Sequence, residues 1–161
     1  MSTWSPPSAP DRLAIMRAAK SVAIVGMSSN SNRASYFVAT YLLAEANYEV
    51  RFVNPMITEV LGRPVVPSLA DLDIAPDIVD VFRRPEDLMS VADEAIAVGA
   101  KTLWLQLGLA DEAVAQHAYD AGLNVVMDRC LKIEHARFKG GLHLAGFDSG
   151  VITSRRARPF D

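Results

Sequence analysis

The chain has 161 residues, half of them hydrophobic, and a formal net charge of −3. This length and composition can bury one substantial core, so we expect a single domain over residues 1–161. The slightly acidic balance disfavours nonspecific binding to nucleic acid, and no stretch approaches the ~20 apolar residues of a membrane span. The first seven residues lack the charged and apolar regions of a signal peptide, so we expect a cytoplasmic protein.

Hydrophobic periodicity predicts alternating helices and strands. In chain order, the patterns give a helix at 11–19, a strand at 22–25, a helix at 36–46, a strand at 50–53, and a proline-interrupted crossover at 56–77 with a short strand near 65–66. A strand at 78–82, a helix at 88–99, a strand at 102–105, a helix at 111–121, a strand at 125–127 and a helical segment at 131–138 follow. This alternation predicts an α/β fold, with an open, mostly parallel sheet and helices on both faces.

The two ends of the chain carry weaker patterns. Residues 1–10 are rich in proline and are expected to be flexible. Residues 139–161 combine paired glycines with three arginines and show little periodicity. This tail is predicted to be peripheral, and a strand, a partner contact and a disordered end all remain open for it.

Polar residues and arginines follow nearly every predicted strand, and ligands of open α/β sheets bind beyond these strand ends. The candidates are Gly26, Ser28, Ser29 and Arg33 after the first strand, Asn54 and Pro55 after the second, Arg83 and Arg84 after residue 82, Gln106 and Gly108 after residue 105, and Asp128, Arg129 and Cys130 after residue 127. Guanidinium groups and a serine-rich loop at a helix N-terminus suit phosphate. The alternative for Arg83 and Arg84 is a solvated loop that pairs with Glu86 or Asp87.

The first loop departs from known nucleotide fingerprints. Ser28 and Ser31 stand where a dinucleotide motif has glycines, and Asn54 stands where an acidic residue would bind the ribose diol. No Gly-Lys-Ser or Gly-Lys-Thr follows Gly26, which excludes a Walker-type loop. A dinucleotide-dependent oxidoreductase is therefore a minority alternative.

The sequence assigns no catalytic residue and no metal site. His117, His135 and His143 lack spacing partners for a metal centre or a nucleophilic triad. Glu134 and His135 are adjacent on a predicted helix, so their side chains should face different ways. A structural role is favoured for both.

Cys130 is the lone cysteine, which excludes an internal disulfide and a cysteine-rich metal site. It precedes a predicted helix, whose N-terminal dipole favours a thiolate. A small core thiol is the favoured interpretation. The functional alternative is a thiol that forms a mixed disulfide with a thiol-bearing ligand or partner.

Six motifs in order carry a resemblance to a known family. They are Val-Ala-Ile-Val-Gly-Met-Ser (22–28), Val-Asn-Pro (53–55), Pro-Ser-Leu-Ala-Asp-Leu (67–72), Asp-Val-Phe-Arg-Arg-Pro (80–85), Trp-Leu-Gln-Leu-Gly (104–108) and Val-Val-Met-Asp-Arg-Cys-Leu-Lys-Ile-Glu-His (125–135). With these motifs the chain resembles the small stand-alone CoA-binding proteins, relatives of the CoA-binding domain in the succinyl-CoA synthetase α subunit. Residues 146–156 are also similar to some members.

The resemblance implies a Rossmann-like, single CoA-binding domain that holds coenzyme A or acyl-CoA along the strand ends. It implies that Gly26, Ser28, Ser29 and Arg33 take the phosphates, that Asn54, Pro55, Ser68, Phe82 and Arg83 border the nucleotide or pantetheine, and that Gln106 and Gly108 lie near the thiol end.

The resemblance supplies no reaction. In the synthetases a phosphorylated histidine sits in a further ligase domain, which 161 residues do not accommodate beside this one. We therefore expect a non-catalytic or regulatory binding module, more probable than an enzyme, with no nucleic-acid or membrane partner. A protein-interaction subunit of an acyl-CoA ligase system is the other alternative.

Overall fold

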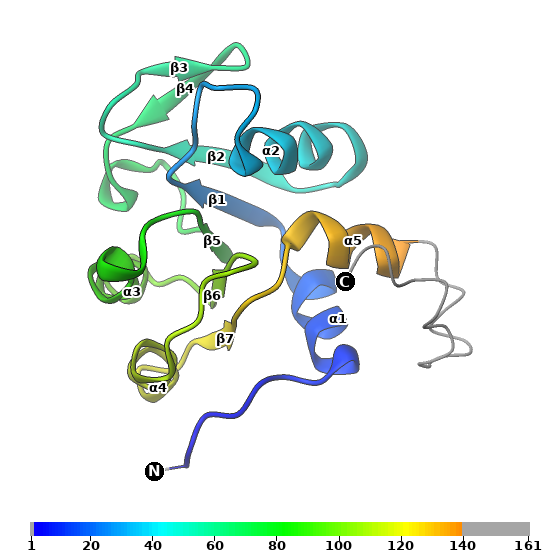
Figure 1. The fold of residues 1–161 in the computed structure, drawn as a ribbon, viewed down its shortest axis with the longest axis vertical. Helices are drawn as coiled ribbons and strands as arrows, with labels where there is room; N and C mark the ends of the chain where they lie inside the picture. The colour runs from blue at the N-terminus through cyan, green and yellow to red at the C-terminus, as the bar shows by residue number, and fades with distance from the viewer. Residues whose placement is uncertain (1, 140–161) are drawn as a thin grey trace.

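The computed structural model describes residues 2–139, and the predicted tail at 140–161 lies outside them. Within these residues the elements are α1 (Ala9–Ala18), β1 (Ser21–Val25), α2 (Ala34–Glu45), β2 (Glu49–Val53), β3 (Glu59–Val60), β4 (Arg63–Val66), η1 (Leu69–Asp71), β5 (Ile78–Val81), η2 (Pro85–Asp87), α3 (Leu88–Ala97), β6 (Thr102–Leu105), α4 (Glu112–Asp120), β7 (Asn124–Val126) and α5 (Leu131–Lys139). Figure 1 shows one sheet between two groups of helices. The predicted α/β, Rossmann-like class is confirmed.

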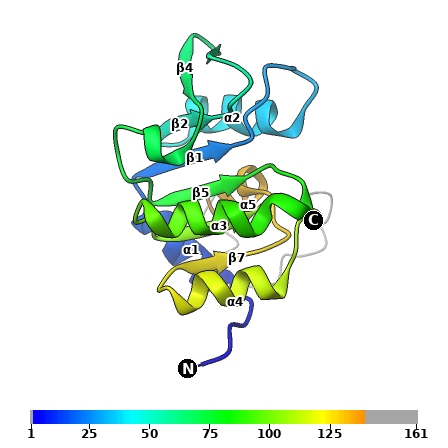
Figure 2. The ribbon, with the colours of Figure 1, turned by 90° about the vertical axis from the view of Figure 1, so that its left-hand side faces the viewer.

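The described strands form one sheet in the order β3-β4-β2-β1-β5-β6-β7. All neighbours pair in parallel except β3 and β4, which form an antiparallel hairpin. The arrows of β1, β5 and β7 accordingly point the same way in Figure 2. The chain builds outward from β1 through β2 and β4, then returns to build β5, β6 and β7 on the other side. This reversal puts the topological switch point between β1 and β5, where such folds bind ligands.

The helices divide between the two faces, as Figure 1 shows. Helices α3 and α4 cover one face, where Val79 and Val81 of β5 point. Helices α1, α2 and α5 cover the other face, which includes Ile78 and Trp104. Because both faces are covered, strands such as β1 are buried at every residue and read as continuous apolar runs.

Local signals set most element boundaries. The Asp111 carboxylate accepts hydrogen bonds from the amides of Ala113 and Val114 at the start of α4, and Gly122 follows that helix at φ +100°. Helix α1 begins at Ala9, two residues before the predicted start, because the Ser8 side chain caps it.

The sequence predicted only the strand near 65–66, and it did not predict the β3–β4 hairpin to which this strand belongs. Its two turn residues, Leu61 and Gly62, have φ values of 54° and 70°. Two consecutive positive φ values match the right-handed twist of a tight hairpin, but leucine is an uncommon residue there. The sequence therefore lacks the usual turn signal.

The N-terminal segment lies along β7, the last strand of the sheet. The Trp4 indole donates to the Val125 carbonyl at 3.2 Å, and the Trp4 amide donates to the Gln116 side chain at 2.7 Å. The Gln116 amide group in turn donates to the Ser2 carbonyl. These contacts cover an otherwise open strand edge. The flexibility expected for residues 1–10 stays a prediction.

None of the helices within residues 2–139 is both long and apolar enough to span a bilayer.

Candidate functional site

The loops after β1 and β5 meet at the switch point. Gly26 follows β1 with φ +89°, and a β-carbon built on it would lie 2.2 Å from the Phe82 carbonyl oxygen and 3.1 Å from Cδ of Arg83. A glycine is therefore required for two independent reasons, its backbone conformation and the close approach of the neighbouring loop. This contact places the side-chain stem of Arg83 beside the first loop.

The first loop is held by its own polar groups. The Ser28 hydroxyl accepts from the Asn30 amide at 3.0 Å, and the Asn30 side chain accepts from the Asn32 amide at 2.9 Å. The Ser28 amide donates to the hydroxyl of Ser35, in the first turn of α2. Ser28 thus shapes the loop, whereas Ser29 is exposed.

Helix α2 begins at this loop without a cap from a side chain. Arg33 occupies the N-cap position, makes no side-chain capping bond, and no acidic residue lies in the first turn. The partial positive charge of the helix N-terminus is consequently not offset locally. Among residues 2–139 no hydrogen bond or ion pair engages the exposed Arg33 guanidinium, so it is available to an anion at the same place.

Asn54 joins the loops after β1 and β2. Its side-chain amide donates to the Met27 carbonyl at 2.7 Å, and its side-chain oxygen accepts from the Met56 amide at 2.8 Å. An ionised carboxylate of the same shape could accept from the Met56 amide but could not donate to the Met27 carbonyl. These two hydrogen bonds are a structural explanation for an asparagine at the position where dinucleotide sites have an acidic residue. Pro55, beside it, is exposed.

The loop after β5 pairs its arginines with its own acids. Arg83 contacts Asp87 at 3.1 Å, and Arg84 lies 3.4 Å from Glu86 and 3.5 Å from Asp87. The hydrogen bond from Arg83 lowers the pKa of Asp87. An anion at this loop would have to compete with Asp87 for Arg83. Arg84 adopts the arrangement expected for a solvated loop.

Ser68 and Phe82 are the two remaining predicted residues, and the Phe82 carbonyl lies against Gly26 of the first loop. Ser68 donates to Asp71 at 2.8 Å in the crossover between β4 and β5. Phe82 is half-buried and packs against the core that α2 and α5 cover.

Gln106 and Gly108 join the loop after β6 to the segment that opens α5. The buried Gln106 side chain accepts from the Leu131 amide at 3.0 Å and so caps α5. The Gly108 amide donates to Asp128 at 2.7 Å. Asp128 has φ +57°, a conformation that aspartate tolerates better than most residues. These two bonds hold the β6 and β7 ends of the site together.

Cys130 is half-buried at the start of α5, where its carbonyl accepts from the Glu134 amide. It lines a cavity of about 250 Å³ together with Arg129 and Arg137. Cys130 therefore lies at the carboxyl ends of the strands and is also packed against the core that α2 and α5 cover.

The sequence interpretation did not predict the burial of two acids, Asp80 and Glu134. Asp80, in the middle of β5, is 0% exposed, and neither carboxylate oxygen has a hydrogen-bond partner among the described residues. Burial raises its pKa well above the ordinary value. A single acid in the apolar run 78–82 is the signal that could have identified it. Glu134 forms a buried ion pair with Arg12 at 2.7 Å, a partner 122 residues away that no local pattern indicates.

The two histidines within residues 2–139 have structural partners, and His143 lies outside these residues. His135 Nδ1 lies 2.9 Å from the Tyr41 hydroxyl. His117 lies 2.6 Å from Asp93 on the neighbouring helix. Within residues 2–139, no three His, Cys, Asp or Glu side chains are grouped to hold a metal ion.

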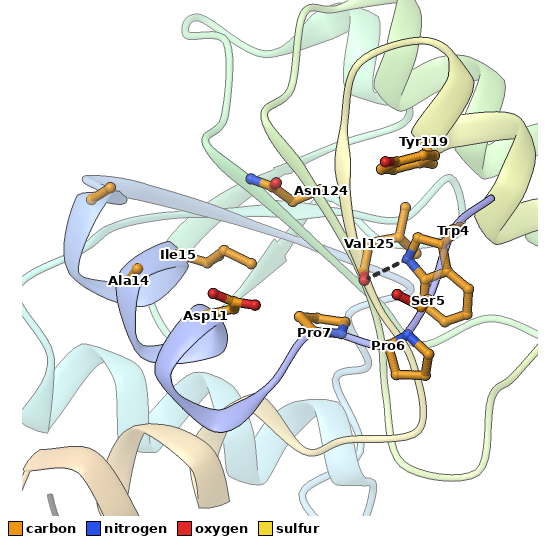
Figure 3. A pocket seen from close by; sticks show the side chains of 11 residues that line it. Trp4, Ser5, Pro6, Pro7, Asp11, Ala14, Ile15, Tyr119, Asn124 and Val125 are labelled. Carbon is orange, nitrogen blue, oxygen red and sulfur yellow. Dashed lines mark hydrogen bonds between the residues drawn. The ribbon is translucent and has the colours of Figure 1, made fainter. Parts of the chain in front are cut away.

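A cavity of about 450 Å³ lies away from the strand-end loops, between the N-terminal segment, α1 and the start of β7. Figure 3 shows Trp4, which is hydrogen-bonded to Val125, on one side of this cavity. Ile15 of α1 lies on the other side, and Asn124 at the start of β7 lies between them. None of the predicted site residues lines it.

Comparison with known proteins identifies the family. A family described as the CoA binding domain matches residues 20–136. The uncharacterized protein YneT of Bacillus subtilis is 40% identical over 130 residues, which are 81% of this chain and 96% of YneT. A hypothetical protein from Pyrococcus horikoshii has a similar structure, with a TM-score of 0.79 and 36% identity over 87% of this chain and all of that one.

A more distant structure shares the fold. An acetyl-coenzyme A synthetase of Ca. Korarchaeum cryptofilum, solved with phosphate and ADP, has a TM-score of 0.64 and 18% identity. The likeness covers 71% of this chain and 27% of the synthetase. The family match and the relatives at 36–40% identity agree with the motifs that follow each strand. The chain belongs to the CoA binding domain family.

Proposed function

We propose that this protein binds coenzyme A or an acyl-CoA along the strand-end edge, by which we mean the loops that follow the carboxyl ends of β1, β2, β5, β6 and β7. The phosphates would lie at the loop 26–33, and the pantetheine arm would be directed toward β6 and β7. The observation that carries the proposal is the start of α2, which has neither a side-chain cap nor an acid in its first turn. Free helix amides and an adjacent Arg33 are complementary to phosphate oxygens.

The loop after β2 supports coenzyme A over NAD. The acidic residue that binds the ribose diol of NAD belongs at the end of β2, and Asn54 is committed there to the Met27 carbonyl and the Met56 amide. Coenzyme A carries phosphates that need donors and does not require this acid. The contacts proposed for Pro55, Ser68, Phe82 and Arg83 would border the nucleotide or pantetheine of the same ligand.

We propose a binding module without catalytic activity of its own. In the described part of the chain, His135 contacts Tyr41, His117 contacts Asp93, and Glu134 pairs with arginines. None of these groups is paired with a nucleophile in the described residues.

Isothermal titration with CoA, acetyl-CoA and NAD tests the proposal. We expect CoA binding, and Arg33→Ala should weaken it at least about tenfold through loss of a charge-assisted contact. Arg17→Ala removes the same charge from the exposed end of α1 and is the matched control. Binding of NAD without binding of CoA would overturn the proposal.

Cys130 is proposed to exchange with CoA disulfide. Its thiolate attacks one sulfur of that disulfide, the CoA–CoA bond breaks, and one CoA thiolate leaves as the Cys130–CoA bond forms. Intact mass after incubation should show one CoA adduct, and Cys130→Ser should show none. An unmodified wild-type mass at neutral pH would eliminate the exchange.

A further inference from the structure

The cavity of about 450 Å³ beside β7 has no role in the proposed function. Its volume falls within the range of roughly 300–1,000 Å³ that is typical of small-molecule sites. Its walls come from the N-terminal segment, one side of α1, the end of α4 and the start of β7. None of the residues proposed to contact coenzyme A lines it, so a ligand here would leave those contacts free.

Most of the cavity wall is apolar. Ala14, Ile15 and Ala18 contribute from α1, where their spacing of three and four residues puts them on one side of the helix. Pro6 and Pro7 contribute from the N-terminal segment. An apolar group that enters the cavity would therefore leave water and contact these side chains.

Two aromatic rings complete the wall, and hydrogen bonds hold both in place. The Trp4 indole donates to the Val125 carbonyl at 3.2 Å, and the Tyr119 hydroxyl lies 2.7 Å from the Ser2 hydroxyl. Figure 3 shows both rings on the side of the cavity away from α1. Aromatic faces attract apolar groups and cations alike, so these walls suit a ligand that has both.

One carboxylate on the wall has no partner in the described chain. Asp11 lies in the first turn of α1, where its backbone amide donates to the Ser8 hydroxyl at 3.2 Å. Its carboxylate forms no hydrogen bond or ion pair with any of residues 2–139. Figure 3 shows this carboxylate between Ile15 and Pro7, among the residues that line the cavity. A cation in the cavity can therefore pair with Asp11.

Asn124 adds a second acceptor. Its side-chain nitrogen donates to the Thr102 hydroxyl at 3.3 Å, and its side-chain oxygen has no partner within residues 2–139. No lysine, arginine or histidine of the described chain lines the cavity. The wall thus combines a negative charge with a neutral acceptor, and a positively charged N–H donor is complementary to both.

This set of groups favours a primary amine over other cations. A primary ammonium has three N–H donors, enough for the Asp11 carboxylate and the Asn124 oxygen, whereas a quaternary ammonium has none. A polyamine would bring further positive charges, and Asp11 is the only acid of residues 2–139 on the wall.

We propose that this cavity binds a primary amine whose apolar body has the size of one aromatic ring. The ammonium group pairs with Asp11, and the body lies between Ile15 and Trp4. The site is separate from the proposed coenzyme A contacts and goes beyond that function.

NMR titration of the full chain, labelled with nitrogen-15, tests the proposal with phenethylamine as the probe. The chain has two tryptophans, and Trp4→Phe identifies the indole signal of Trp4. This signal should shift and saturate, because Trp4 lines the cavity. The signal of Trp104 should stay in place, because that indole is buried and donates to the Arg129 carbonyl at 2.8 Å.

Two matched comparisons test the role of charge. Phenethyl alcohol has the same body without the positive charge and should bind at least about tenfold more weakly. Asp11→Asn keeps the shape of the side chain, and should weaken phenethylamine binding about tenfold or more while leaving that of the alcohol unchanged. Glu112→Gln removes a charge from the same place in α4, its first turn, and should leave phenethylamine affinity intact. Circular dichroism checks that each variant is folded.

Three outcomes would overturn the proposal. The first is a Trp4 signal that does not move with phenethylamine up to about 10 mM. The second is phenethyl alcohol binding to the wild type as tightly as the amine, which would show a purely apolar cavity. The third is equal weakening by Asp11→Asn and Glu112→Gln, which would show only general attraction to a chain of net charge −3. Each of these results leaves the proposed coenzyme A site standing, because that site is tested by a separate titration.

Discussion

The buried Asp80 should make the protein less stable as pH rises above about 4. Its side chain is fully buried between neighbouring residues Ile24 of β1 and Trp104 of β6, and its carboxylate has no partner in the described chain. Burial raises the pKa of Asp80 in the folded state, whereas the unfolded chain keeps the ordinary value of about 3.9. Above that pH, unfolding releases a proton, so the free energy of unfolding falls.

Asp80→Asn isolates this effect because asparagine has nearly the same shape as the protonated acid and does not titrate. Below about pH 4 both proteins should have the same stability. Above it, the variant should gain about 1.4 kcal/mol per pH unit, until the pKa of Asp80 in the folded state is reached. At pH 7 the gain is therefore bounded at about 4 kcal/mol, since that is three units above the unfolded value.

Urea unfolding followed by circular dichroism at pH values from 4 to 8 measures the difference between the two proteins. Asp73→Asn is a suitable control, because the hydrogen bond from Arg51 lowers the pKa of the exposed Asp73 and its replacement should act in the opposite direction. Parallel stability profiles for wild type and Asp80→Asn would refute the reasoning. They would mean that the Asp80 carboxylate is solvated or paired in the folded protein.

Three other substitutions test the frame of the site by thermal or urea unfolding. Gly26→Ala should lower the free energy of unfolding by roughly 2–5 kcal/mol, because of the positive φ and the 2.2 Å approach to the Phe82 oxygen. A decrease below about 1 kcal/mol would show that the two loops separate easily. Asn54→Asp should cost about 1–3 kcal/mol at neutral pH, because a carboxylate cannot donate to the Met27 carbonyl, and unchanged stability would remove the structural explanation for the missing acid. Glu134→Gln should cost about 3–5 kcal/mol by leaving three guanidinium groups without their carboxylate, and a neutral result would argue that these arginines are well hydrated.

The sheet could be predicted because its strands follow rules that operate within a few residues. Covered on both faces, β1 reads as an apolar run that ends in Gly26, and Asp111 and Gly122 mark the ends of α4. Features that depend on distant partners were not predictable. The course of residues 2–7 along β7 requires Gln116 and Val125, more than 100 residues away.

The same distinction applies to the candidate site. Gly26 could be identified because both its conformation and its position after a strand are local properties. The partners of Gln106 and Asn54 could not be identified, since each side chain binds a backbone group of another loop. Nearly every residue has the same backbone groups, so residue types do not indicate which of them a side chain will bind. The roles proposed for these residues toward a ligand stay predictions.

The polar residues at the strand ends therefore fall into two groups with different consequences for binding. The side chains of Asn54 and Gln106 form hydrogen bonds with backbone groups of neighbouring loops. Their replacement should therefore lower the stability of the fold before it changes ligand affinity. Arg33 and Arg129 lie at opposite ends of the edge and keep exposed guanidinium groups. Because Arg33 occupies the N-cap of α2, which has neither a side-chain cap nor an acid in its first turn, its replacement should weaken the binding of an anion with little effect on the fold.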